Sequence, residues 1–99
     1  MERQYEEIIP TVWKPLKEGD TFEGRIISRE RNIGIDNKST LYHFENNTGQ
    51  FVIWGCTVLD DRMSYVNDGD YVRITFKGLK QNKKGQDVKI YKVERQVNA

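Results

Sequence analysis

Apolar and polar residues alternate along most of the chain after its first twenty positions. Between residues 21 and 31, Phe22, Gly24 and Ile26 share one face while Glu23 and Arg25 lie on the other. The same period of two recurs over residues 40–45, 50–54, 71–77 and 87–94. This pattern predicts five β-strands, and a glycine in the middle of the first predicts a bend or bulge there.

One interval between the third and fourth of these strands has a different period. Its apolar residues recur at helical spacing and are Val58, Leu59, Met63 and Val66. Thr57 suits an N-cap, and Asp60 is an acidic residue of the first turn. The run Asn-Asp-Gly-Asp at residues 67–70 ends the pattern. The sequence therefore predicts one short helix between the third and fourth strands.

The remaining segments connect these elements. Residues 1–20 predict an irregular N-terminal arm, because Pro10 and Pro15 prevent a continuous helix. Five apolar residues are expected to hold this arm against the domain: Ile8, Ile9, Val12, Trp13 and Leu16. Residues 32–39 and 78–86 are polar and predict loops, and Asn-Asn-Thr-Gly at residues 46–49 predicts a hairpin turn. The expected organisation is an arm (1–20), one domain (21–95) and a short tail (96–99).

The order strand, strand, strand, helix, strand, strand predicts the fold class. It is the order of the OB-fold, an all-β barrel of five strands with a helix between strands 3 and 4. The other small barrel that we considered, of the SH3 type, usually has only a 3₁₀ turn at that place. A chain of 99 residues is long enough for one such domain.

Composition changes this picture little, but the distribution of charge adds to it. The chain has 16 basic and 15 acidic residues, a net charge of +1 that by itself indicates no polyanionic partner. Five lysines and one acid, Asp87, lie between residues 77 and 89, whereas three glutamates lie among the first seven residues. The basic charge is therefore concentrated in and around the loop predicted at residues 78–86.

Several classes of protein are disfavoured by the sequence. The single cysteine, Cys56, has no partner for an internal disulfide, and with the single histidine, His43, it is too little for a metal site. Nucleophilic catalysis at Cys56 would have only His43 as a base, so we expect no enzyme and no cofactor. No apolar run is long enough to span a membrane, and the first residues lack a signal-peptide core. We therefore expect a cytoplasmic protein.

Two stretches of the chain carry a family resemblance. Residues 51–55, Phe-Val-Ile-Trp-Gly, and residues 66–74, Val-Asn-Asp-Gly-Asp-Tyr-Val-Arg-Ile, resemble the pattern of single-stranded-DNA-binding OB domains in the replication protein A superfamily. From Val12 to about Arg95 the chain resembles compact single-stranded-DNA-binding proteins of bacteriophages and mobile elements. It differs from the cellular bacterial protein because it lacks an acidic tail ending in phenylalanine. The resemblance implies a non-catalytic protein of DNA replication or recombination.

Such a protein needs flat side chains for bases and cations for phosphates. In an OB-fold the second and third strands form the floor of the cleft, and two loops form its walls. For stacking we predict Trp54 on the floor, and either Tyr42 or His43, which point to opposite faces of their strand. The predicted cationic contacts are Arg25, Arg31, Lys38, Arg73, Lys80, Lys83 and Lys84.

Alternatives to this function remain open at the level of sequence. An OB module that serves as a protein-binding adaptor is consistent with the near-neutral charge, and RNA is a ligand of many OB domains. A homodimer, or a replication or recombination protein, is expected as a further partner.

Overall fold

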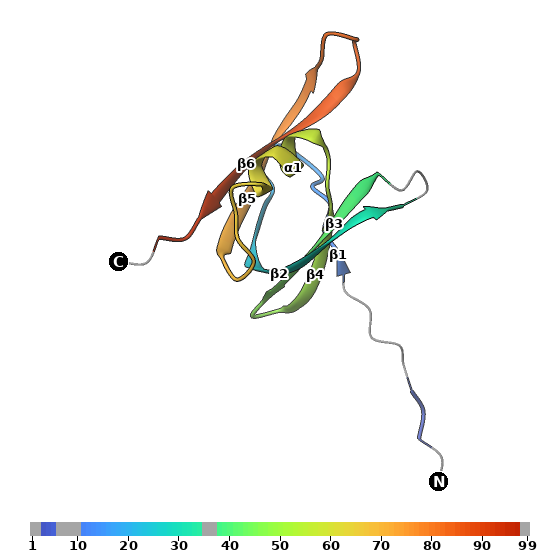
Figure 1. Cartoon of the computed structure of the whole chain (residues 1–99), viewed down its shortest axis with the longest axis vertical. Helices are drawn as coiled ribbons and strands as arrows, with labels where there is room; N and C mark the ends of the chain where they lie inside the picture. Colours follow the sequence, from blue (N-terminus) through green and yellow to red (C-terminus); the bar gives the residue numbers. More distant parts are fainter. Residues whose placement is uncertain (1–2, 6–10, 35–37, 98–99) are drawn as a thin grey trace.

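The computed structural model describes residues 3–5, 11–34 and 38–97. Within these residues the chain forms six strands and one helix (Figure 1). In chain order they are β1 (Thr11–Val12), β2 (Thr21–Ile33), β3 (Ser39–Asn46), β4 (Gly49–Trp54), α1 (Thr57–Met63), β5 (Tyr71–Gln81) and β6 (Asp87–Arg95). The predicted all-β class is confirmed, and so is a single short helix between the strands over residues 49–54 and 71–81.

The strands form one curled sheet with the order β1-β4-β3-β2-β5-β6 (Figure 1). All neighbours are antiparallel except β1 and β4, which are parallel. In the described residues no ladder joins β6 to β4, so the sheet is not closed into the predicted five-stranded barrel. The free edge of β4 is instead taken by β1, where Thr11 and Val12 pair with Phe51 and Val52.

Strand β2 belongs to both halves of the sheet. Residues Thr21 to Arg25 pair with β5, and from Arg25 onward the strand pairs with β3. The predicted bend is present, but the register shifts lie between Ile26 and Ser28 and between Glu30 and Ile33 rather than at Gly24. Gly24 is required for another reason: a Cβ there would lie 2.9 Å from the Phe22 ring.

The core lies on the concave side of this curled sheet. In each of these strands the residues that alternation places on one face are buried, including Phe22 and Ile26 of β2, Phe44 of β3 and Ile74 of β5. Leu59 and Met63 on α1 complete the core, and α1 packs against β6. The prediction of Thr57 as N-cap is wrong by one residue. Cys56 is the N-cap, without a side-chain hydrogen bond, and Thr57 is the first residue of α1.

The segment after β1 is partly built into the domain rather than wholly irregular. The backbone N–H of Trp13 donates to the Val52 carbonyl at 2.9 Å, and the Trp13 ring packs against Phe22 at 5.8 Å between centroids. Leu16, expected to anchor this segment, is 93% exposed. Ile8 and Ile9, also predicted anchors, lie outside the described residues.

A turn then follows, and its backbone hydrogen-bonds to β5. The Asp20 carboxylate accepts hydrogen bonds from the backbone N–H groups of residues 16 and 17, at 2.7 and 3.1 Å. These two bonds are the main reason that the pKa of Asp20 is lowered. The N–H of Gly19 donates to the Phe76 carbonyl at 2.8 Å. Residues 13–19 therefore bridge the edge of β4 and the middle of β5.

Both predicted polar loops are shorter than expected because strands extend into them. β5 continues to Gln81 and β6 begins at Asp87, so residues 77–92 form a hairpin that projects from the body of the sheet (Figure 1). A register shift between Phe76 and Leu79 accommodates Gly78, whose φ is 97°. Of the other loop, residues 32 and 33 belong to β2 and Ser39 to β3, and residues 35–37 lie outside the described residues.

Candidate functional site

The outward face of β3 and β4 exposes one large aromatic ring. Trp54, the last residue of β4, is 42% exposed and pairs with the half-buried Leu41 of β3. The next pair on this face is His43 with Val52, and Val52 is buried (6% exposed) beside Val12 of β1. Phe51 faces the other way and packs against the core. Phe51 and Trp54 therefore lie on opposite faces of β4, as alternation along a strand requires.

The structure decides between Tyr42 and His43. Tyr42 is 3% exposed, and its hydroxyl donates to Asp60 Oδ1 at 2.6 Å. Burial and then this hydrogen bond raise the pKa of Tyr42. Its prediction as a ligand contact is corrected, because its side chain belongs to the core. His43 points outward, with Nε2 2.5 Å from Glu30 Oε1.

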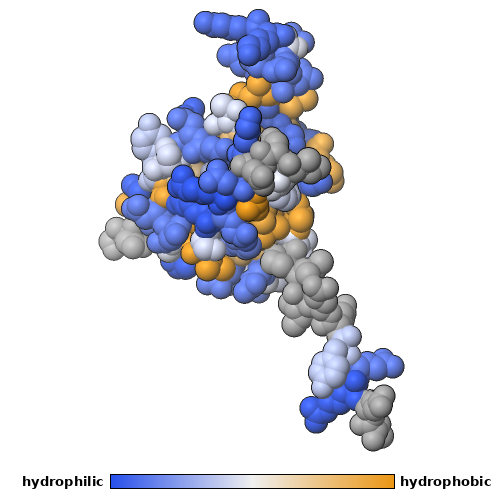
Figure 2. Space-filling view, turned by 45° about the vertical axis from the view of Figure 1, so that its right-hand side comes forward, coloured by the Kyte–Doolittle hydropathy of each residue, from blue (hydrophilic) through white to orange (hydrophobic). Residues whose placement is uncertain are grey.

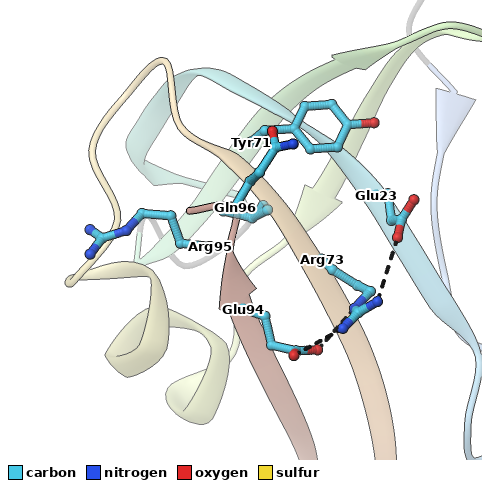
Figure 3. Close-up of a pocket in the computed structure, with 7 residues that line it drawn as sticks. Glu23, Tyr71, Arg73, Glu94, Arg95 and Gln96 are labelled. Carbon is cyan, nitrogen blue, oxygen red and sulfur yellow. Dashed lines mark hydrogen bonds and ion pairs between the residues drawn. The ribbon is translucent and has the colours of Figure 1, made fainter. Parts of the chain in front are cut away.

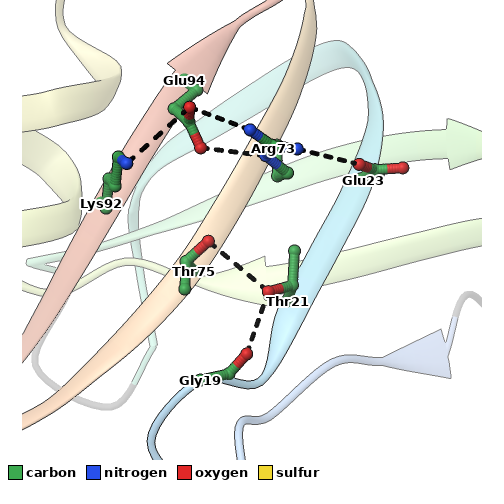
Figure 4. A network of polar contacts seen from close by, with 7 residues as sticks. All are labelled: Gly19, Thr21, Glu23, Arg73, Thr75, Lys92 and Glu94. Atoms are coloured by element: carbon green, nitrogen blue, oxygen red, sulfur yellow. Dashed lines mark hydrogen bonds and ion pairs between the residues drawn. The ribbon is translucent and has the colours of Figure 1, made fainter.

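Two of the predicted cations hold the sheet together. The Arg25 guanidinium donates to the Gly69 carbonyl and lies 5.8 Å from the centre of the Tyr71 ring. Arg73 makes two hydrogen bonds to Glu94, of 2.9 and 3.0 Å (Figure 4). This contact is the main cause of the lowered pKa of Glu94. Both arginines are therefore already engaged by groups of the protein.

Arg29 is a structural cation whose role the sequence did not indicate. Its guanidinium donates to the carbonyls of Met63 (2.8 Å) and Val66, and it pairs with Asp68 at 3.1 Å. Its side chain is 13% exposed and lies over the Tyr42 ring. Arg29 thus satisfies carbonyl groups where α1 ends, which helices leave without partners. The sequence carries no signal for this contact, because it joins residues 34 or more positions apart.

The lysines of the β5–β6 hairpin differ from these arginines. Five of them are exposed and, among the described residues, have no carboxylate within ion-pairing distance: Lys77, Lys80, Lys83, Lys84 and Lys89. Figure 2 shows the projecting end of the hairpin as a hydrophilic surface. Its tip is ordered by Asn82, whose Oδ1 accepts hydrogen bonds from the N–H groups of Lys84 and Gln86.

The other predicted cations lie at the opposite hairpin. Arg31 is exposed near the end of β2, and Lys38 is exposed just before β3. A Cβ on Gly34, between them in sequence, would lie 3.9 Å from the Trp54 ring. This end of the β2–β3 hairpin is therefore next to Trp54.

Two cavities that the sequence did not predict adjoin each other at Tyr71. One, of about 340 Å³, is lined by residues of β5 and β6 and by Gln96 (Figure 3). The other, of about 460 Å³, is lined by Trp13, Phe51 and the turn at residues 46–48. Glu23 and Tyr71 line both cavities. The available signal was the outward position of Tyr71 in the alternating pattern of residues 71–77.

The described residues contain no cluster of three histidine, cysteine, aspartate or glutamate side chains that could hold a metal ion. They also include no helix of the length and apolarity needed to cross a bilayer. Comparisons of the chain with family models, curated proteins and solved structures found no match.

Proposed function

We propose that this domain binds single-stranded DNA without catalysing a reaction and acts in replication or recombination of a phage or mobile-element genome. The observation that carries the proposal is the projecting hairpin with five exposed lysines that are not neutralised by the described part of the protein. Lysines held in this state attract a polyanion, because phosphates can replace the counterions around them.

The arrangement of strands supports an OB-type domain. Three antiparallel strands, β2, β3 and β4, are followed by α1 and then by β5 and β6, and β2 pairs with both β3 and β5. An OB-fold has this order and this shared strand. The ladder that would close the barrel is the part that is missing from the described residues.

The position of Trp54 supports a role in stacking. Trp54 ends β4 three residues before α1 begins, and α1 packs against β6, from which the hairpin extends. A strand bound along the outward face of β3 and β4 would thus have the indole for a base. The hairpin lysines and Arg31 would lie on either side for its phosphates. Base stacking on an aromatic ring contributes about 1 to 3 kcal/mol per base and depends little on sequence.

Tryptophan fluorescence tests the proposal directly. The chain has two tryptophans, so Trp13→Phe leaves Trp54 as the only indole. We expect oligo-thymidine to quench the fluorescence of this variant, with an affinity that falls steeply as salt is added. Trp54→Phe is the matched variant, in which the quenching contributed by Trp54 is lost and any remaining change comes from Trp13.

The same titrations also distinguish the two alternative functions, RNA binding and protein binding as an adaptor. Tighter binding of a matched RNA oligomer would favour an RNA-binding domain, because only RNA offers the 2′-hydroxyl. No quenching with either oligomer at micromolar protein would contradict nucleic-acid binding and favour the adaptor.

A further inference from the structure

The two cavities around Tyr71 have the shape and the groups of a binding site. The two cavities, together called the hollow, share Glu23 and Tyr71 in their linings. One reaches Trp13 and Phe51, and the other reaches the end of β6. Tyr71 is half-buried, and its ring is held by the Arg25 guanidinium on β2. Figure 3 shows the ring next to the side chain of Gln96, with Glu23 and Arg73 across from them.

The charges of this hollow are balanced, unlike those of the hairpin. Glu23 and Glu94 face Arg73, and Arg95 lies 3.8 Å from Asp70. Such a lining offers little attraction to a phosphate. It suits a flat and neutral group with donors and acceptors at its edge, because the lining includes the Tyr71 ring, one face of which lies under Arg25, and the Gln96 amide. A nucleobase has these properties.

By strand register, Tyr71 faces the same side of the sheet as Trp54. Across the sheet, Tyr71 pairs with Arg25, Arg25 with Glu45, and Glu45 with Gln50. Gln50 is four residues before Trp54 on the same strand. With strands about 4.8 Å apart and about 3.3 Å per residue, Trp54 and Tyr71 are separated by about 20 Å along the surface. About six nucleotides stacked at about 3.4 Å each would cover this distance.

We infer that Tyr71 is a second base-stacking position, reached by a strand that first contacts Trp54 and the hairpin. This inference rests on the proposed function. It adds a second contact site, Tyr71, and a path for the bound strand across the sheet from Trp54. Oligomers long enough to reach both Trp54 and Tyr71 gain binding free energy from base stacking on both rings. Oligomers shorter than about six nucleotides reach only one of them.

The test compares Tyr71→Ala with Tyr71→Phe, which keeps the ring and removes only the hydroxyl. We expect Tyr71→Ala to bind an oligo-thymidine of about 16 nucleotides about tenfold more weakly, and Tyr71→Phe to bind like the parent. In a Trp13→Phe background, the fluorescence of Trp54 is measured in the same titration. Quenching of Trp54 at saturation should be unchanged by Tyr71→Ala, because that ring is still occupied. Thermal unfolding of each variant verifies the fold.

Each outcome separates the inference from the proposed function. Equal affinities of Tyr71→Ala and the parent, with Trp54 still quenched, would remove the second position and leave the proposed function intact. Loss of affinity in Tyr71→Phe as well would overturn stacking and indicate a role of the hydroxyl. Absence of Trp54 quenching in the parent would overturn the proposed function itself.

Discussion

The body of the sheet and the β5–β6 hairpin differ in whether their basic side chains already have partners within the protein. In the body, Arg29, Arg73 and Arg95 each lie against a carboxylate, and Arg25 binds a carbonyl. On the hairpin, the lysines at positions 77, 80, 83, 84 and 89 face solvent with no carboxylate partner in the described chain. The net charge of +1 hides this difference, because Arg25, Arg29, Arg73 and Arg95 already bind groups of the protein, whereas the five hairpin lysines have no carboxylate partner in the described chain.

This contrast separates cations that hold the fold from cations available to a ligand. When a guanidinium with several fixed partners is removed, those partners are left unsatisfied. An exposed lysine without a partner contributes little to stability, and it is free to neutralise a phosphate. Removal of body cations should therefore change stability, and removal of hairpin cations should change binding.

The largest expected effect comes from reversing the hairpin charge. Lys80→Glu, Lys83→Glu and Lys84→Glu together should weaken binding of oligo-thymidine at low salt by at least about a hundredfold, because three attractions to phosphate become repulsive. The slope of log affinity against log salt should become shallower by about 2, at about 0.7 for each phosphate that is no longer neutralised. Fluorescence titrations at several salt concentrations measure both quantities.

A matched pair of variants controls for net charge. Lys83→Glu with Lys84→Glu, and Lys14→Glu with Lys17→Glu, change the charge equally, but the second pair lies on the segment between β1 and β2. Only the hairpin pair should lose affinity. Equal losses in both would mean that the hairpin is not a specific contact and that only overall charge matters.

Removing Arg29 should have the next largest effect and should act on the fold. Arg29→Ala removes the arginine donor from the Val66 carbonyl, leaves the Met63 carbonyl with only the Val66 N–H, and opens space over Tyr42. We expect the free energy of unfolding in urea to fall by about 2 to 3 kcal/mol. Lys83→Ala is the comparison from the hairpin and should change it by less than about 0.5 kcal/mol. Similar changes of the free energy of unfolding in both variants would contradict the distinction between cations that hold the fold and cations available to a ligand.

The smallest effect concerns pH and also belongs to the body. The pKa values of Asp20 and Glu94 are lowered by the hydrogen bonds that their carboxylates accept. Groups with lowered pKa stabilise the fold above the pKa of the unfolded chain, near about pH 4, and this contribution is lost as pH falls below it. Urea unfolding between about pH 7 and about pH 3 should therefore show a decline in acid that is shallower in Asp20→Asn. Reversal of the hairpin lysines should leave this decline unchanged, and a steeper decline in Asp20→Asn would contradict the assignment.

The fold was predictable where local pattern decides it. Because one side of a sheet is buried, alternation predicted which residues of each strand share a face, and one such set is buried in each of β2, β3 and β5. The change from a period of two to helical spacing at Val58 predicted the position of α1, because a helix also buries one face. The hairpin was underestimated because lysine, glutamine and glycine have low strand propensity, whereas pairing with residues 87–89 extends β5 to Gln81.

The candidate site was predictable only in part. Side-chain parity showed that Tyr42 and His43 face opposite ways, but the choice between them required the position of Asp60 on α1. The engagement of Arg25 and Arg73 could not be foreseen, since Gly69 and Glu94 are distant in sequence and come close only through strand pairing. Tyr71 was visible as an outward residue, but not as the wall of two cavities.

The sequence by itself determined the all-β class, the place of the helix and the concentration of lysines near residues 77–89, because these depend on neighbours along the chain. Only the tertiary structure decided that β1 takes the edge of β4, which residues line the hollow at Tyr71 and which of the described cations are left without carboxylate partners. These are contacts between segments far apart in sequence. Their formation depends on how the curled sheet brings those segments together.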